Sequence, residues 1–123
     1  MKSFQYTDAD FKVVYQNEGW KIGLLRCSER FSALTRMERH LCTDEVFVLL
    51  SGQATLYVCR ENKGLQEQPL ERDTVYAVEQ GEWHHLVVSA GATVLVAENG
   101  DTSKENTEVT MNVQCCFNQA KSL

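Results

Sequence analysis

The sequence predicts an all-β barrel or sandwich, and three observations lead to that fold class. Short apolar runs of strand length recur along the chain, turn residues separate them about every eight to twelve residues, and no long window carries a helical apolar stripe. The chain of 123 residues is long enough for one hydrophobic core and too short for two. We therefore expect a single domain over residues 1–123, with its barrel core at about 20–99 and a loop, a last strand and a tail over 100–123.

The first strands are expected around a polar turn near the N-terminus. Runs rich in Val, Ile, Leu and aromatic residues at 11–15 and 20–27 flank Asn17-Glu18-Gly19, which is turn chemistry. The next run, 31–40, alternates apolar and polar residues and is expected to form a third strand. By pattern alone, its charged face (Arg36, Glu38 and His40) is typical of a solvated strand surface.

The rest of the chain repeats the same pattern of short runs and turns. Glycine-containing turns at Ser51-Gly52, 61–64, 79–82 and 89–91 separate the later runs. The strands expected there cover residues 46–50, 54–59, 65–70, 74–78, 83–88, 92–97 and 109–113.

Charge and cysteine content exclude several classes of function. The net charge is −5, from 12 basic and 17 acidic residues, and no basic stripe is present, which disfavours nucleic acid and anionic membrane surfaces as partners. The first residues lack the apolar segment of a signal peptide, so we expect a cytoplasmic protein. Five cysteines without a CxxC pair favour reduced thiols, and the sequence assigns no role to Cys115 and Cys116.

The stretch from Met37 to Val58 combines reactive side chains with two expected strands. Glu38, His40, Cys42 and Glu45 precede an apolar run, so residues able to bind a metal ion or move a proton lie at the mouth of buried strands. For Cys42 a packed thiol is the simpler interpretation, and for Glu45 the plain alternative is a carboxylate that ends a strand at the surface.

The spacing in this stretch resembles the first motif of the cupins, a family of small double-stranded β-helix barrels. That motif reads glycine, five residues, His-x-His, three or four residues, Glu, six residues, glycine. Here His40, Glu45 and Gly52 match in identity and spacing, while Glu38 stands at the first histidine and Ser32 at the first glycine.

A second cupin motif reads glycine, five residues, Pro-x-Gly, two residues, His, three residues, Asn. Gly81 and His84 match it, whereas Asp73, Glu79 and Val88 replace the glycine, proline and asparagine. The resemblance covers about residues 20–99 and implies a double-stranded β-helix, that is, a cupin-type jelly-roll barrel.

The resemblance also implies a site inside the barrel. Arg36, Glu38 and His40 would point inward, His84 would face them from another strand, and His85 would point outward as a surface residue. His40, Glu45 and His84 would then be metal ligands, with Glu38 as a fourth, for a divalent ion such as Fe, Mn or Zn. A carboxylate at position 38 favours manganese or iron over copper.

Three functions remain open from the sequence. The first is a barrel that binds a small polar metabolite, such as a sugar derivative, with or without the metal ion; ligand-binding residues would be Arg36, Glu38, Tyr57 and Tyr76. The second is a metal-free sugar isomerase or epimerase that uses His and Glu as acid and base. The third is a ligand-sensing module without catalysis. In each case exposed strand edges near both termini favour a homodimer.

Overall fold

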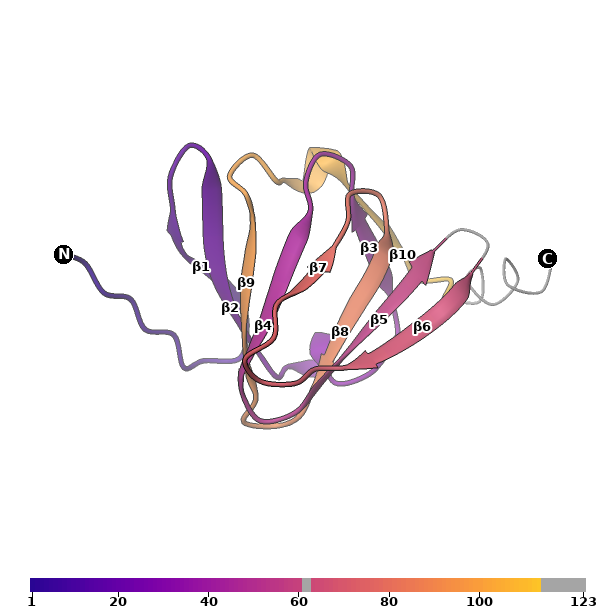
Figure 1. Cartoon of the computed structure of the whole chain (residues 1–123), viewed down its shortest axis with the longest axis horizontal. Coiled ribbons are helices and arrows are strands. Elements are labelled where there is room, and N and C mark those ends of the chain that lie inside the picture. Colours follow the sequence, from indigo (N-terminus) through magenta and orange to yellow (C-terminus); the bar gives the residue numbers. More distant parts are fainter. Residues whose placement is uncertain (61–62, 114–123) are drawn as a thin grey trace.

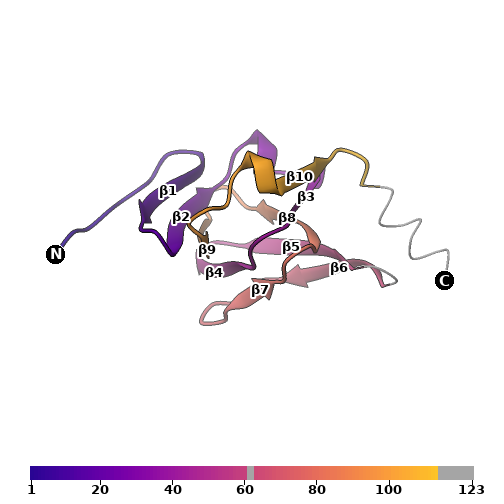
Figure 2. The same cartoon turned by 90° about the horizontal axis from the view of Figure 1, so that it is seen from above.

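The computed structural model, described here for residues 1–60 and 63–113, consists of two five-stranded antiparallel sheets (Figures 1 and 2). The strands are β1 (Asp10–Gln16), β2 (Trp20–Arg26), β3 (Met37–His40), β4 (Glu45–Ser51), β5 (Ala54–Arg60), β6 (Gly64–Pro69), β7 (Tyr76–Val78), β8 (Trp83–Val88), β9 (Thr93–Asn99) and β10 (Thr107–Thr110). Two short 3₁₀ helices, η1 (Glu29–Phe31) and η2 (Lys104–Asn106), complete the described fold. The predicted all-β class is confirmed.

The two sheets interleave segments that are distant in the sequence. The first sheet has the order β1-β2-β9-β4-β7, which Figure 1 shows from left to right, and the second has the order β10-β3-β8-β5-β6. Consecutive strands β3 and β4 lie in different sheets, as do β7 and β8, so the chain crosses between layers repeatedly. Residues from β3, β4, β8 and β9 are thereby brought to one interior.

A hydrophobic core fills the space between the sheets. Alternate residues of the strands point inward, so Phe47 and Leu49 on β4 meet Leu56 on β5 and Leu86 on β8. Val94 and Val96 on β9 are almost completely buried in the same cluster, whose members include Leu25, Phe31, Ala54, Leu70, Val78, Val88 and Ala92. This core makes the backbone around the polar residues rigid.

Gly52 closes the β4–β5 turn in a way that needs glycine. Its φ is +76°, in the left-handed region, and a Cβ there would lie 2.6 Å from the Cα of Ala92. The turn therefore packs directly on the chain before β9. This contact gives a physical reason for the glycine that ends the first cupin-like motif.

The segment predicted as a strand over 31–40 is only partly a strand. β3 begins at Met37, and Phe31 ends η1 instead, where the Ser32 hydroxyl donates to the Glu29 carbonyl at 2.8 Å. Local side-chain hydrogen bonds of serine compete with strand pairing in this way. The last strand ends at Thr110 rather than at residue 113. Cys115 and Cys116, to which the sequence assigned no role, lie outside the described residues.

Candidate metal centre and cavity

Glu38 and His84 are brought together by strand pairing. They are direct partners across β3 and β8, so their side chains leave the same face of the second sheet. His40 lies two residues beyond Glu38 and shares that face. The strand period therefore places three potential ligands side by side.

Glu45 reaches the same point from the first sheet. Glu45 is the first residue of β4 and is only 7% exposed. Its Oε2 lies 2.6 Å from His40 Nε2 and 3.0 Å from His84 Nε2. The loop between His40 and Glu45 is fixed by backbone N–H groups, because Asn99 donates to the Thr43 hydroxyl at 3.0 Å and Gln80 donates to Asp44 at 2.8 Å. The two residues that flank this loop, His40 and Glu45, both belong to the site, so the loop fixes their relative position.

The outer nitrogens of the two imidazoles are held by neighbours. His84 Nδ1 donates to the Glu82 carbonyl at 3.1 Å, and His40 Nδ1 lies 2.8 Å from the Thr107 hydroxyl. Partners on the outer nitrogen fix the ring and direct Nε2 toward the interior, as in histidine ligands of metal sites.

The inward atoms have the arrangement that a metal ion requires. One ligating atom from each of Glu38, His40, Glu45 and His84 lies within 4.8 Å of all the others. His40 Nε2 is buried, and the Glu45 carboxylate lies 2.6 Å from it as an ion-pair partner. Two imidazoles and two carboxylates suit a divalent first-row ion, so this buried group can hold a metal.

The charges of this group are strongly coupled. Burial alone would raise the pKa of Glu45, but the two adjacent imidazoles lower it to about 2. Burial alone would lower the pKa of His40 and of His84, but the Glu45 carboxylate raises both. The metal-free cluster is therefore a carboxylate between two imidazoles that bind protons more tightly than usual.

Glu98 is a fifth ionisable residue of the site that the sequence did not single out. It lies directly opposite Glu45 across β4 and β9, and its Oε2 is 3.8 Å from His40 Nε2. Burial, followed by the nearby Glu45 charge, raises its pKa to about 7. A pairing partner in another strand cannot be read from the local pattern, which is why Glu98 was missed.

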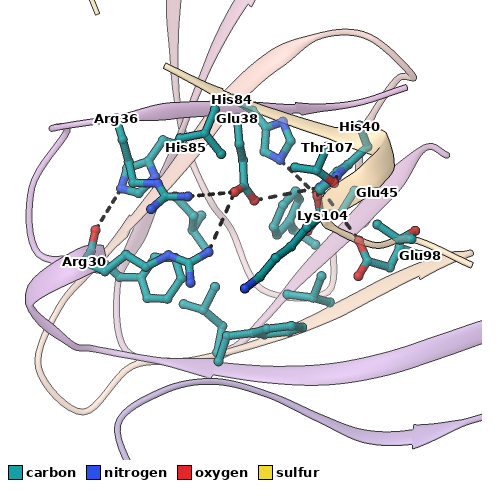
Figure 3. A pocket seen from close by; sticks show the side chains of 18 of the residues that line it. Arg30, Arg36, Glu38, His40, Glu45, His84, His85, Glu98, Lys104 and Thr107 are labelled. Carbon is teal, nitrogen blue, oxygen red and sulfur yellow. Dashed lines mark hydrogen bonds and ion pairs between the residues drawn. The ribbon is translucent and has the colours of Figure 1, made fainter. Parts of the chain in front are cut away.

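These residues border a cavity of about 720 Å³. Its apolar wall comes from Phe11, Leu25, Phe31, Phe47, Leu86, Val96 and Val109. Polar residues converge on the other side, as Figure 3 shows: the four-residue group and Glu98 lie together, with Arg30, Arg36 and Lys104 also bordering the space. A concave apolar pocket with a few convergent polar groups is typical of a small-molecule site.

Of the residues predicted to bind ligand, Arg36 and Glu38 line this cavity, and Tyr57 and Tyr76 are not among its lining residues. Tyr57 lies between the inward-facing Leu56 and Val58, so it points outward, and its hydroxyl donates to Glu67 at 3.3 Å. Tyr76 packs against the core, and its hydroxyl accepts the backbone N–H of Glu71.

The expectation that His85 is an ordinary surface residue is wrong. His85 is only 3% exposed, its Nε2 donates to the Arg30 carbonyl at 3.1 Å, and its ring stacks on Phe31. Segment η1 folds over this face of β8, which a period-two pattern cannot reveal. His84 is buried as expected, and it is the histidine that meets Glu45.

Comparisons with solved structures define the fold. A cupin-2 domain protein from Shewanella frigidimarina is 17% identical with a TM-score of 0.59, covering 76% of this chain and 84% of that one. A PAC13 variant from Streptomyces, solved with uridine, is 9% identical with a TM-score of 0.66, covering 89% and 91%. KdgF from Halomonas is 12% identical with a TM-score of 0.55, covering 80% and 87%.

No protein-family profile and no curated protein matches the sequence. The structural neighbours nevertheless show that this chain is a small domain with the cupin fold, an all-β jelly-roll, as the motif spacing implied. Within the described residues, no helix is long and apolar enough to cross a membrane.

Proposed function

We propose that this domain binds a small polar metabolite, such as a sugar derivative, in its cavity, next to a divalent metal ion held by His40, Glu45 and His84. Glu38 is the fourth ligand in this proposal. The observation that carries it is the convergence of four ligating atoms within 4.8 Å at a cavity of about 720 Å³. The crystallised PAC13 protein with uridine offers a parallel for a small polar ligand in this fold.

The residues around the ion would define its properties. Iron, manganese or zinc fits two imidazoles and two carboxylates, and such an ion would supply Lewis-acid polarisation of a bound oxygen group. Thr107 and the Glu82 carbonyl hold the two histidine rings in the orientation that presents Nε2. Phe47 packs edge-on against His84 and keeps water from that side of the ring.

Metal analysis of untagged protein tests this proposal. Protein dialysed against chelator and reloaded with Mn²⁺, Fe²⁺ or Zn²⁺ should bind about one ion per chain, measured by elemental analysis and calorimetry. His40→Ala and His84→Ala should each lower the affinity by at least about a hundredfold, following the loss of a direct ligand. His85→Gln is the matched control, because His85 borders the same cavity outside the four-residue group.

The metal proposal fails if the reloaded wild-type protein retains no ion, or if His85→Gln loses as much affinity as His84→Ala. Circular dichroism of each variant separates loss of a ligand from loss of the fold.

A metal-free isomerase or epimerase is the second candidate. It is favoured by the position of Glu98, whose Oε2 lies 3.8 Å from His40 Nε2 and whose burial raises its pKa to about 7. A group that titrates near neutrality can both accept and donate a proton. Exchange of solvent deuterium into sugar phosphates in the presence of chelator would support this candidate, and exchange only after metal loading would exclude it.

We also propose that the protein acts as a cytoplasmic homodimer. The outer side of the first sheet supports the dimer, because Phe4, Tyr15 and Trp20 adjoin there and are 51%, 39% and 46% exposed. Large exposed apolar side chains gathered on one sheet mark interaction surfaces. Light scattering of the wild type should give twice the monomer mass, and Trp20→Lys should reduce that value. A monomer mass for the wild type refutes the dimer.

A further inference from the structure

Three cationic side chains border the cavity from separate segments. Arg30 belongs to η1, Arg36 precedes β3, and Lys104 begins η2. Figure 3 shows Arg30 and Arg36 beside Glu38, while the Lys104 side chain extends into the space from the opposite side. The fold brings them together, because strands β3 to β9 lie between Arg36 and Lys104 in the sequence.

Glu38 already shows which group fits between the two arginines. Its Oε2 lies 3.2 Å from Arg36 Nη2 and 3.7 Å from Arg30 Nη2, whereas its Oε1 is the oxygen nearer His40, at 3.8 Å from Nε2. One carboxylate therefore contacts the arginine pair on one side and the metal-binding group on the other. The planar guanidinium fork matches the two oxygens of a carboxylate, and it matches a phosphate as well, so its shape alone does not choose between these anions.

The cationic side chains have donor capacity beyond this internal contact. Arg36 Nε is buried without a hydrogen-bond partner among the described residues. The Lys104 amine makes no hydrogen bond or ion pair with the residues drawn in Figure 3. Arg30 is held in place by stacking, with its guanidinium 4.7 Å above the Phe31 ring. Arg30 and Arg36 thus contact one carboxylate, Glu38, and Lys104 adds a third positive charge from the opposite side of the cavity.

We infer that Arg30, Arg36 and Lys104 form an anion subsite that binds a carboxylate group of the metabolite beside the four-residue group. This inference rests on the proposed function and adds the charge of the ligand to it. A singly charged carboxylate is favoured over a phosphate dianion, because Glu38, Glu45 and Glu98 all line the same cavity and repel a second negative charge more strongly. Lys104 contacts the ligand directly, and the arginine pair orients it.

The shared position of Glu38 couples this subsite to the metal-binding group. A ligand carboxylate competes with Glu38 Oε2 for the two arginines, and Glu38 released from them is free to turn both oxygens toward His40 and Glu45. Because coupling between two binding sites is reciprocal, the metal ion strengthens carboxylate binding by the factor by which the carboxylate strengthens metal binding.

Titration of the ¹⁵N-labelled full-length protein with acetate tests the inference, and acetamide is the matched neutral probe. Acetate should give saturable amide shifts confined to residues 29–38 and 103–107, and acetamide should not. Lys104→Ala should weaken acetate binding about tenfold, the loss expected for one charge-assisted hydrogen bond. Arg72→Ala, which removes a positive charge from an exposed turn, should leave the affinity unchanged.

Glu38→Gln is a second variant, and it should change the affinity for acetate and the affinity for Mn²⁺ in opposite directions. It should strengthen acetate binding, because the internal competitor loses its charge, and weaken Mn²⁺ binding, because a ligand is lost. A general loss of folding would weaken both.

Equal shifts from acetate and acetamide, an unchanged acetate affinity in Lys104→Ala, or tighter binding of inorganic phosphate than of acetate would each overturn the inference. Paramagnetic broadening by Mn²⁺ around His40 and His84 is measured on the same samples. Normal Mn²⁺ broadening without acetate binding refutes only the anion subsite, and acetate binding without Mn²⁺ broadening refutes only the metal proposal.

Discussion

Glu98→Gln tests the electrostatics of the site without any ligand. In the folded metal-free protein the pKa of Glu98 rises from 4.5 to about 7. The folded state therefore holds a proton between these pH values that the unfolded state has lost, so the free energy of unfolding decreases as pH rises through this window. Below pH 4.5 both states are protonated, and the effect is absent. Glutamine remains neutral throughout.

The size of the effect follows from the pKa difference. A rise from 4.5 to about 7 corresponds to about 3.4 kcal/mol at about 1.36 kcal/mol per pKa unit. Water in the adjoining cavity screens the charge, so we expect roughly 1 to 2 kcal/mol. Glu98→Gln should thus be more stable than the wild type by that amount at about pH 8, and equally stable at about pH 4.

Urea denaturation in the presence of chelator, followed by tryptophan fluorescence across this pH range, measures the difference. Glu108→Gln is a suitable control, because Glu108 on β10 forms an exposed ion pair with Arg39 on β3 and lies outside the cavity lining. A Glu98→Gln advantage that is the same at pH 4 and pH 8, or that grows toward acid, would refute the assigned environment of Glu98.

Three further predictions concern the metal-binding group and the scaffold. Metal affinity should fall by up to about a hundredfold per pH unit below the raised pKa values of His40 and His84, because two protons compete with the ion. A competition assay with a chelating dye measures this affinity, and an affinity that does not change with pH would contradict the prediction. Thr107→Val should lower metal affinity about tenfold by removing the partner of His40 Nδ1, and Thr110→Val, at the end of the same strand, should leave it unchanged in the same assay. Gly52→Ala should lower the free energy of unfolding by roughly 2 kcal/mol or more in urea denaturation, since it adds a Cβ at positive φ against Ala92. Gly91 also has a positive φ but has open space around it, so Gly91→Ala should lower the free energy of unfolding by less. An equal decrease in the two variants would argue against the close contact between Gly52 and Ala92.

The part of the site that could be predicted from the sequence is the part fixed by local geometry. His40 and Glu45 are separated by one short loop between β3 and β4, and Gly52 closes the next turn, so their spacing survives as a motif. The two-residue period of β3 similarly places Glu38 with His40. Strand positions were predictable for the same reason, because apolar runs and turn residues are local signals.

The residues that were missed depend on contacts between distant segments. Glu98 joins the site because β9 pairs with β4 in the register that sets it opposite Glu45, and Thr107 joins through the pairing of β10 with β3. His85 is covered because η1, which ends at the first residue of the segment expected as a strand, contacts this part of β8. Neither strand register nor a covering segment is encoded within a short window, so these placements require the folded chain.

Charge balance explains how the same arrangement of His40, Glu45 and His84 can be stable both with and without a metal ion. In the metal-free protein both nitrogens of His84 face oxygen acceptors, the Glu82 carbonyl and Glu45, and this arrangement favours the cationic form of the ring. The pKa of His40 is raised by the same carboxylate. Below the raised pKa values of both rings, a divalent ion that displaces one proton from each ring leaves the net charge of the site unchanged, so Glu45 keeps a positive partner in either state. In that pH range the protonated histidines stabilise the buried carboxylate until the ion replaces their protons. This exchange is also the reason that two protons, rather than one, should set the pH dependence of metal binding.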